Sequence, residues 1–264
     1  MAKRLKLVTR AFGAEPGLPD VPALAAWIAT HRGQLADITT YRLDESLSPQ
    51  LGAGIAFPCA GGKFYADRIL SALTGITERR AVGELHIDPH AIIEDAAGLV
   101  VRKKGAWCAL PAPHALGVKD EYFNDPFEWN DALCKAYRTI MRTMRDTGID
   151  GHVLVCDTID REELAALAWQ KAFFFEPRTD RTSLATLLER QHQVAVRKED
   201  LLMLLGLLDE YEVSRICILD PDPQAIGLAR AHFDPDQIVA GGYCTSGDAG
   251  TYWKDLAGAA EFTV

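Results

Sequence analysis

The chain has 264 residues, of which 48% are hydrophobic, which is enough for one large core or two of ordinary size. The formal net charge is −9, so general binding to the phosphate backbone of nucleic acid is disfavoured. The longest apolar run, residues 201–208, is far shorter than the roughly 20 residues that cross a bilayer. The six cysteines lack Cys-x-x-Cys spacing and are typical of reduced thiols. These properties favour a cytoplasmic protein that contacts neither nucleic acid nor membrane.

The first part of the chain, residues 1–126, predicts a mixed α+β portion. Asp20 is expected to cap a helix that has Pro22 in its first turn. A second helix is expected from Lys63 to about Leu73. Short β-like runs predict strands at 38–41, 55–57, 91–93, 99–101 and 106–110, with 94–98 as a hairpin loop. Some antiparallel pairing is therefore expected here.

The second part, residues 127–264, predicts a parallel α/β portion. Apolar runs at 152–156, 172–175, 194–196, 215–219 and 237–241 alternate with amphipathic helical runs. Strands that are apolar on both faces are typical of a parallel sheet covered by helices. We therefore predict a doubly wound sheet of the Rossmann or flavodoxin-like type. The segment from Leu201 to Leu208 predicts a helix that is apolar nearly all round, either buried or used in a homodimer interface.

Polar residues follow several of these predicted strands. Ligands of an open parallel sheet bind beyond the carboxyl ends of its strands, so Asp157 and Asp220 are candidate acid–base groups or metal partners. Free backbone N–H groups in the glycine-rich segment after the last strand suit an anion. The alternative is a flexible surface turn. The candidate anion-binding residues in this segment are Gly241, Gly242, Thr245 and Ser246.

A second glycine-rich segment lies in the first part of the chain. A predicted strand runs into Cys59, and Gly61, Gly62 and Lys63 then lead into a helix. A thiol at a helix start is made more acidic by the helix dipole, which suits a nucleophile. The turn itself is a second candidate anion site, and the alternative is a tight turn around a small buried thiol. His114, on a proline-rich loop, is a candidate catalytic partner.

The segment from Glu84 to His90 is rich in metal-ligand side chains. On a strand, Glu84, His86, Asp88 and His90 would share one face. His86, Asp88 and His90 are therefore candidate ligands for a divalent metal, zinc or iron. Pro89 cannot donate to a strand ladder, so this strand must lie at an edge or end there. A polar strand that faces solvent is the alternative.

Together these patterns predict a protein that binds a small anionic metabolite between its two portions. As an enzyme, it would be a metal-assisted hydrolase or a group transferase. One alternative is a non-catalytic ligand-binding or regulatory module that forms a homo-oligomer through the Leu201 to Leu208 helix. The other is a cysteine enzyme that uses Cys59.

Overall fold

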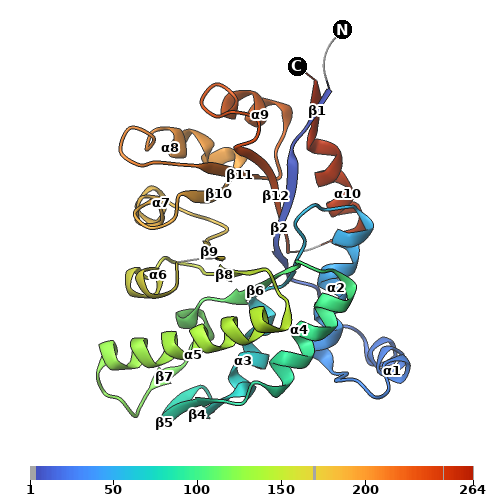
Figure 1. Ribbon diagram of the computed structural model, residues 1–264, viewed down its shortest axis with the longest axis vertical. Coiled ribbons are helices and arrows are strands. Elements are labelled where there is room, and N and C mark those ends of the chain that lie inside the picture. The colour runs from blue at the N-terminus through green and yellow to red at the C-terminus, as the bar shows by residue number, and fades with distance from the viewer. Residues whose placement is uncertain (1–3, 169–170, 246, 264) are drawn as a thin grey trace.

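The computed structural model describes residues 4–168, 171–245 and 247–263 (Figure 1). Its centre is two four-stranded parallel sheets, with strand orders β10-β11-β12-β2 and β3-β6-β8-β9. The strands are β2 (Val8–Ala14), β3 (Cys59–Gly61), β6 (Trp107–Pro111), β8 (Gly151–Val155), β9 (Ala172–Phe175), β10 (Gln193–Arg197), β11 (Arg215–Leu219) and β12 (Ile238–Cys244). The predicted α/β class with parallel strands is confirmed.

The two sheets are joined between β2 and β3. Arg10 and Phe57 form a parallel bridge, and Phe57 exchanges backbone hydrogen bonds of 3.0 Å with Thr9 and Ala11. From β2 to β9 the strands therefore follow chain order, and β12 pairs back onto β2. A doubly wound sheet reverses its order in the middle, whereas this succession is that of an eight-stranded (βα)8 barrel. Pairing crosses the predicted boundary at residue 126 twice, in β2–β12 and in β6–β8.

The circle of strands is open between β9 and β10. In the described part of the chain these two strands are not paired by hydrogen bonds. Here the side chain of Gln191 takes the place of a neighbouring strand. Its Oε1 accepts a hydrogen bond from the Phe174 N–H at 2.8 Å, and its Nε2 donates to the Phe174 carbonyl at 3.1 Å. A side-chain amide offers the same donor and acceptor as a peptide group, so the buried edge of β9 is satisfied.

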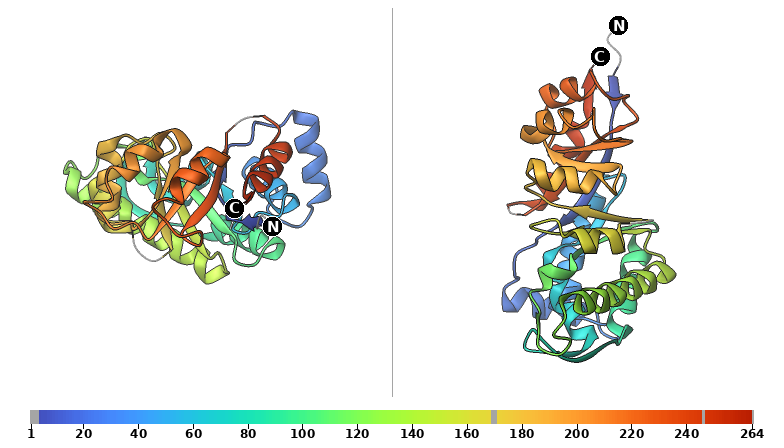
Figure 2. Two further views of the ribbon diagram at one scale, coloured as in Figure 1. Left: turned by 90° about the horizontal axis from the view of Figure 1, so that it is seen from above. Right: turned by 90° about the vertical axis from the view of Figure 1, so that its left-hand side faces the viewer.

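Helices surround the strands, and Figure 2 shows the elongated body that results. They are α1 (Val21–Thr30), α2 (Ile38–Gly52), α3 (Ala66–Ala72), α4 (His90–Arg102), α5 (Pro126–Thr147), α6 (Arg161–Leu167), α7 (Arg181–Leu188), α8 (Leu201–Leu205), α9 (Pro223–Ala229) and α10 (Ala249–Ala259). Short 3₁₀ turns lie at Lys63–Tyr65, Pro113–Leu116 and Lys198–Asp200. Within the described residues, no helix is both long and apolar enough to span a membrane.

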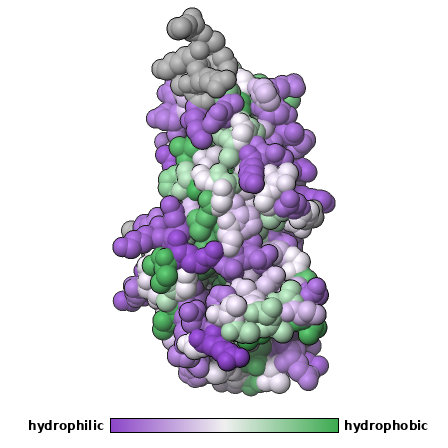
Figure 3. Space-filling model, turned by 90° about the vertical axis from the view of Figure 1, so that its right-hand side faces the viewer, coloured by the Kyte–Doolittle hydropathy of each residue, from purple (hydrophilic) through white to green (hydrophobic). Residues whose placement is uncertain are grey.

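Two small sheets, each built on an antiparallel pair of strands, complete the fold. β1 (Arg4–Lys6) pairs with β13 (Glu261–Thr263), which brings both ends of the chain together at the top of Figure 1. β4 (Leu73–Thr77) and β5 (Arg80–Ile87) form a hairpin at the bottom, with β7 (Lys119–Asp120) beside β5. On the face covered by α1, α2 and α10, polar side chains separate the exposed apolar ones into small patches (Figure 3).

From β3 to β9 the two faces of the barrel wall bury different cores, because successive strand residues point to opposite sides. In β9, Phe173 and Phe175 belong to a cluster that fills the barrel and continues under helices α7 to α10, whereas Phe174 belongs to a second cluster among the other helices. Phe12 of β2 lies between the two inner rings, with centroid distances of 5.3 Å to Phe173 and 4.9 Å to Phe175. The ring of Phe175 in turn meets that of Tyr243 edge to face at 5.3 Å.

Three stretches that were predicted as strands are helical. Residues 38–41 begin α2 because the Asp37 carboxylate accepts the N–H groups of Thr39 and Thr40, both at 2.9 Å. Residues 91–93 and 99–101, with the predicted hairpin loop between them, form the single helix α4. Its buried residues Ile92, Ala96 and Leu99 recur at helical spacing, and tertiary packing overrides the β-branched composition.

The leucine-rich segment is a shorter helix than predicted, since α8 spans Leu201–Leu205. Leu201, Leu204 and Leu207 are buried in the cluster that β10, β11 and β12 share with the helices α7 to α10, and Leu202 is exposed. Its use in a homodimer stays a prediction. The predicted caps are confirmed: Asp20 accepts the Ala23 N–H of α1 at 2.7 Å.

Candidate functional site

A pocket of about 290 Å³ lies at the carboxyl ends of the strands. Barrel enzymes carry their catalytic residues at this end, on the segments that follow the strands. The acids of this pocket come directly after buried strands. They therefore lie at the carboxyl ends of the strands, as the sequence predicts. The lining residues are Glu15, Lys63, Cys156, Asp157, Glu176, Pro177, Arg178, Tyr243 and Thr245.

Glu15, at the end of β2, organises one wall of the pocket. Its Oε1 accepts hydrogen bonds from the Tyr243 hydroxyl at 2.6 Å and from the Lys63 N–H at 2.5 Å. A Cβ atom at Gly62 would lie 2.5 Å from the same oxygen, so only glycine permits this approach. In this turn the Lys63 N–H therefore donates to the chain's own Glu15 carboxylate, and the Gly61 N–H donates to the Ser46 hydroxyl at 3.0 Å. Binding of an external anion by Gly61, Gly62 and Lys63 stays a prediction.

Lys63 and Asp157 form an ion pair across the pocket mouth, at 2.5 Å. Asp157 is well exposed, and such surface pairs contribute at most about 1 kcal/mol. A charged ligand can therefore separate them at little cost. The position of Asp157 in the pocket agrees with its predicted place at a strand end.

Glu176, at the end of β9, is the most buried acid in this wall, with 6% of its surface exposed. Burial raises the pKa of its carboxyl above the ordinary value, against the hydrogen bonds of Thr179 and Ser183. Its Oε2 is buried and has no hydrogen-bond partner among the described residues. A carboxyl group of this kind in a pocket is suited to exchange a proton with a ligand.

Asp220, at the end of β11, lies beside this pocket and does not line it. Its carboxylate accepts a hydrogen bond from the Tyr252 hydroxyl at 2.6 Å, and burial raises its pKa. The Tyr252 oxygen accepts the Tyr243 N–H at 2.9 Å. Asp220 is therefore connected to Glu15 through two tyrosines, a positioning arrangement that the sequence did not reveal.

The predicted pair of Cys59 and His114 is not brought together. Cys59 lies inside β3, fully buried, and burial raises the pKa of its thiol well above the usual value. His114 instead pairs with Glu163 of α6 at 2.8 Å, and this hydrogen bond raises the pKa of the imidazole. Cys59 thus has neither the exposure nor the acidity of a nucleophile.

The last glycine-rich segment begins within a strand, since β12 extends to Cys244. Gly241 and Gly242 lie in β12, where a Cβ atom at 241 would be 2.9 Å from the Phe12 ring. A Cβ atom at 242 would be 2.7 Å from Leu256. Both glycines therefore make room for packing and offer no anion site. Thr245 lines the pocket, and Ser246 lies outside the described residues.

The predicted metal ligands do not share one face. β5 ends at Ile87, so Asp88 and His90 lie beyond the strand, and His90 begins α4. His86 lies 3.8 Å from Glu84, and His90 lies 3.2 Å from Glu94. In the ranges that the structure describes, no three His, Cys, Asp or Glu side chains are grouped to hold a metal. These residues therefore do not fit the predicted ion.

The succession of strands and the pocket at their carboxyl ends define the class of this protein, a parallel α/β barrel. No protein-family model matches the sequence, and no curated protein matches it. Solved structures with this fold include a putative vitamin-B12-independent methionine synthase from Listeria monocytogenes, with a TM-score of 0.66, 13% identity and 97% of both chains covered.

Two further structures share the fold. A B12-independent methionine synthase from Shewanella sp. W3-18-1, in complex with selenomethionine, gives a TM-score of 0.65 at 14% identity, covering 97% of this chain and 96% of that one. A methyltransferase from Methanosarcina mazei gives 0.53 at 8% identity, covering 97% and 93%. At these identities the likeness establishes the fold alone.

Proposed function

We propose that this protein is a group transferase that acts on a small zwitterionic molecule in the carboxyl-end pocket. The observation that carries the proposal is the buried Glu176 carboxyl, one oxygen of which has no hydrogen-bond partner in the described parts of the chain, in a pocket that also contains cations. The fold supports it, because the similar structures include methionine synthases and a methyltransferase.

The charges around the pocket suit an amino-acid-like substrate. Arg178 is exposed and has no ion-pair partner within the described segments, so it is available for a substrate carboxylate. Asp157 also lines the pocket, and its one ion pair among the described residues is with Lys63, so it is available for an ammonium group. A volume of about 290 Å³ is at the small end of ligand pockets and matches such a molecule.

Glu176 is the proposed proton acceptor. The nucleophilic atom of the substrate, a thiol sulfur or an amine nitrogen, forms a bond to the transferred group as the bond from that group to its donor breaks. The proton that the nucleophile loses passes to the Glu176 carboxylate. The raised pKa of this carboxyl makes it a better base than an exposed glutamate.

The test uses L-homocysteine and L-methionine as probes. We expect calorimetry to detect binding to the wild-type protein and a loss of roughly tenfold in Arg178→Gln, the size of one charge-assisted hydrogen bond. Glu176→Gln should retain binding but slow methyl transfer to homocysteine at least about 100-fold, the usual contribution of general base catalysis. Methionine is measured by mass spectrometry, with a sulfonium compound or a methylated pterin as donor.

Glu189→Gln is the matched control, because Glu189 lies at the surface beside Arg161, away from the pocket. It should leave binding and turnover unchanged. Absence of binding of either amino acid at millimolar concentration would contradict the proposed substrate class. Unchanged turnover in Glu176→Gln would contradict the role given to that carboxyl.

A further inference from the structure

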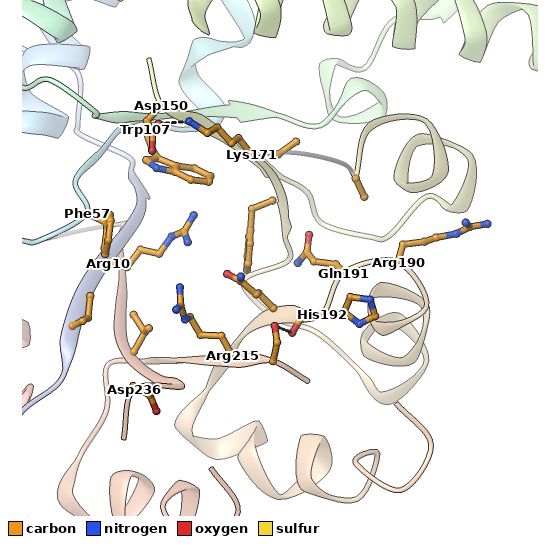
Figure 4. Close-up of a pocket in the computed structure, with 17 residues that line it drawn as sticks. Arg10, Phe57, Trp107, Asp150, Lys171, Arg190, Gln191, His192, Arg215 and Asp236 are labelled. Atoms are coloured by element: carbon orange, nitrogen blue, oxygen red, sulfur yellow. Dashed lines mark hydrogen bonds and ion pairs between the residues drawn. The ribbon is translucent and has the colours of Figure 1, made fainter. Parts of the chain in front are cut away.

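The opposite end of the barrel contains a second cavity, larger than the first. Its volume is about 640 Å³, and it lies where the strands begin (Figure 4). The strands around it contribute Val8, Arg10, Trp107, Phe173, Gln193, Arg215 and Val239. The interior of such a barrel is ordinarily filled by layers of side chains. An open volume of metabolite size at this end is therefore unexpected for a purely structural region.

Arg10 is the central feature of this cavity. Arg10 is only 8% exposed. The central carbon of its guanidinium lies 4.2 Å from the centre of the Trp107 ring and 5.2 Å from that of the Phe173 ring. One terminal nitrogen, a buried Nη, has no hydrogen-bond partner among the residues described. Stacking on aromatic rings offsets part of the desolvation cost of a cation. This buried Nη requires an acceptor that the described residues do not supply.

A second arginine points into the same space. Figure 4 shows the side chains of Arg10 and Arg215 both directed into the cavity, whereas that of Arg190 points away. Of the two acids in the lining, Asp150 is engaged by Lys171 in an ion pair, and Figure 4 shows Asp236 turned outward. The cavity is therefore cationic, in a chain whose net charge is −9.

The walls of the cavity also favour a ligand that has an apolar part. Phe57 and Trp107 present apolar surface beside the two guanidinium groups. Guanidinium groups bind carboxylates and phosphates with paired hydrogen bonds, and flat rings stack on one another. We propose that this cavity is a second binding site, for a small organic anion that carries a carboxylate or phosphate on a ring or other apolar body.

The site is separate from the carboxyl-end pocket and shares no lining residue with it. In the complex, the anionic group pairs with Arg10 and Arg215, and the apolar body lies against Trp107 and Phe57. The existence of this second site does not depend on the proposed transferase reaction, because none of the residues assigned to that reaction lines this cavity.

Phenyl phosphate and benzoate are the probes, with inorganic phosphate and benzyl alcohol as partial ligands. We expect calorimetry with the full chain to show saturable binding of phenyl phosphate or benzoate and weaker binding of both partial ligands. Whichever of the two binds more tightly identifies the anionic group. Binding should fall at least about tenfold in Arg10→Met and in Arg215→Gln, the loss of one charge-assisted hydrogen bond.

Arg215 is exposed, so Arg215→Gln is expected to fold even if Arg10→Met does not. Arg142→Gln, on the exposed side of α5, is the matched control and should bind as the wild type does. Trp107 fluorescence should change on binding in the wild type and in this control. Absence of binding by the wild-type protein, or equal affinity in Arg215→Gln and the control, would overturn the proposal.

Discussion

His152 lies in β8 with its imidazole fully buried and its Nε2 3.0 Å from the Met141 carbonyl of α5. Burial lowers the pKa of this ring from 6.5 to about 4. In the unfolded chain the ring takes up its proton near pH 6.5, whereas in the folded protein it stays neutral until about pH 4. The contribution to stability is therefore complete above pH 6.5 and is lost as the pH falls toward 4.

This linkage can be measured with His152→Gln. Between pH 7.5 and pH 4.5 we expect the wild-type protein to lose about 2 kcal/mol more unfolding free energy than the variant. Urea unfolding at both pH values gives the two differences, and His86→Gln, an exposed histidine, is the control. Equal pH slopes for wild type and His152→Gln would show that the ring is protonated in the folded protein.

At the same scale, the sequence could indicate part of the pocket but not its organising residue. Asp157 and Lys63 stand beside apolar runs with recognisable turn residues, and both line the pocket. Glu15 follows β2, whose apolar pattern is interrupted by Thr9 and Arg10. Arg10 is tolerated inside the barrel only because rings stack on it, a tertiary effect that no local pattern contains. An acid directly after a strand was the available signal.

Among the elements, the open position between β9 and β10 depends on one side chain. Replacing Gln191 by methionine keeps its volume but leaves the buried N–H and carbonyl of Phe174 without partners. We expect Gln191→Met to lower the unfolding free energy by about 2–4 kcal/mol. Gln237→Met, whose hydrogen bonds lie at the surface, should cost less than about 1 kcal/mol.

Chemical denaturation of both variants makes this comparison, and equal losses of unfolding free energy would mean that water replaces the Gln191 hydrogen bonds.

The elements that were predicted wrongly have one cause in common. The β-branched residues of α4 favour a strand locally, and the helix forms because Ile92 and Leu99 find a core between the neighbouring helices. Elements buried on both faces, such as β8 and β11, were predictable because their apolar runs need no such context.

For the whole molecule, the parallel class was predictable and the circular arrangement was not. Closure requires β2 to pair with β12, which lies at the other end of the chain, and no local pattern specifies that contact. The predicted boundary at residue 126 can be tested with fragments 1–126 and 127–264. We expect neither to unfold cooperatively alone, because fragment 1–126 exposes the paired edges of β2 and β6, and fragment 127–264 exposes those of β8 and β12.

Circular dichroism during thermal unfolding is the measurement. Mixing or coexpressing the fragments should restore a single cooperative transition, which serves as the control for fragment quality. A cooperative transition in fragment 127–264 by itself would instead support two independent portions.

The aromatic rings inside the barrel have a further consequence. Phe12 touches Phe173, which lines the cavity at the strand starts, and also Phe175, which supports Tyr243 in the pocket at the strand ends. The volumes of these ring side chains are therefore coupled, because a tightly packed interior transmits a change in the size of one side chain to its neighbours. A substitution that changes the shape of the cavity at the strand starts must therefore be accommodated in the pocket at the strand ends. The residues that line the two sites cannot change size independently.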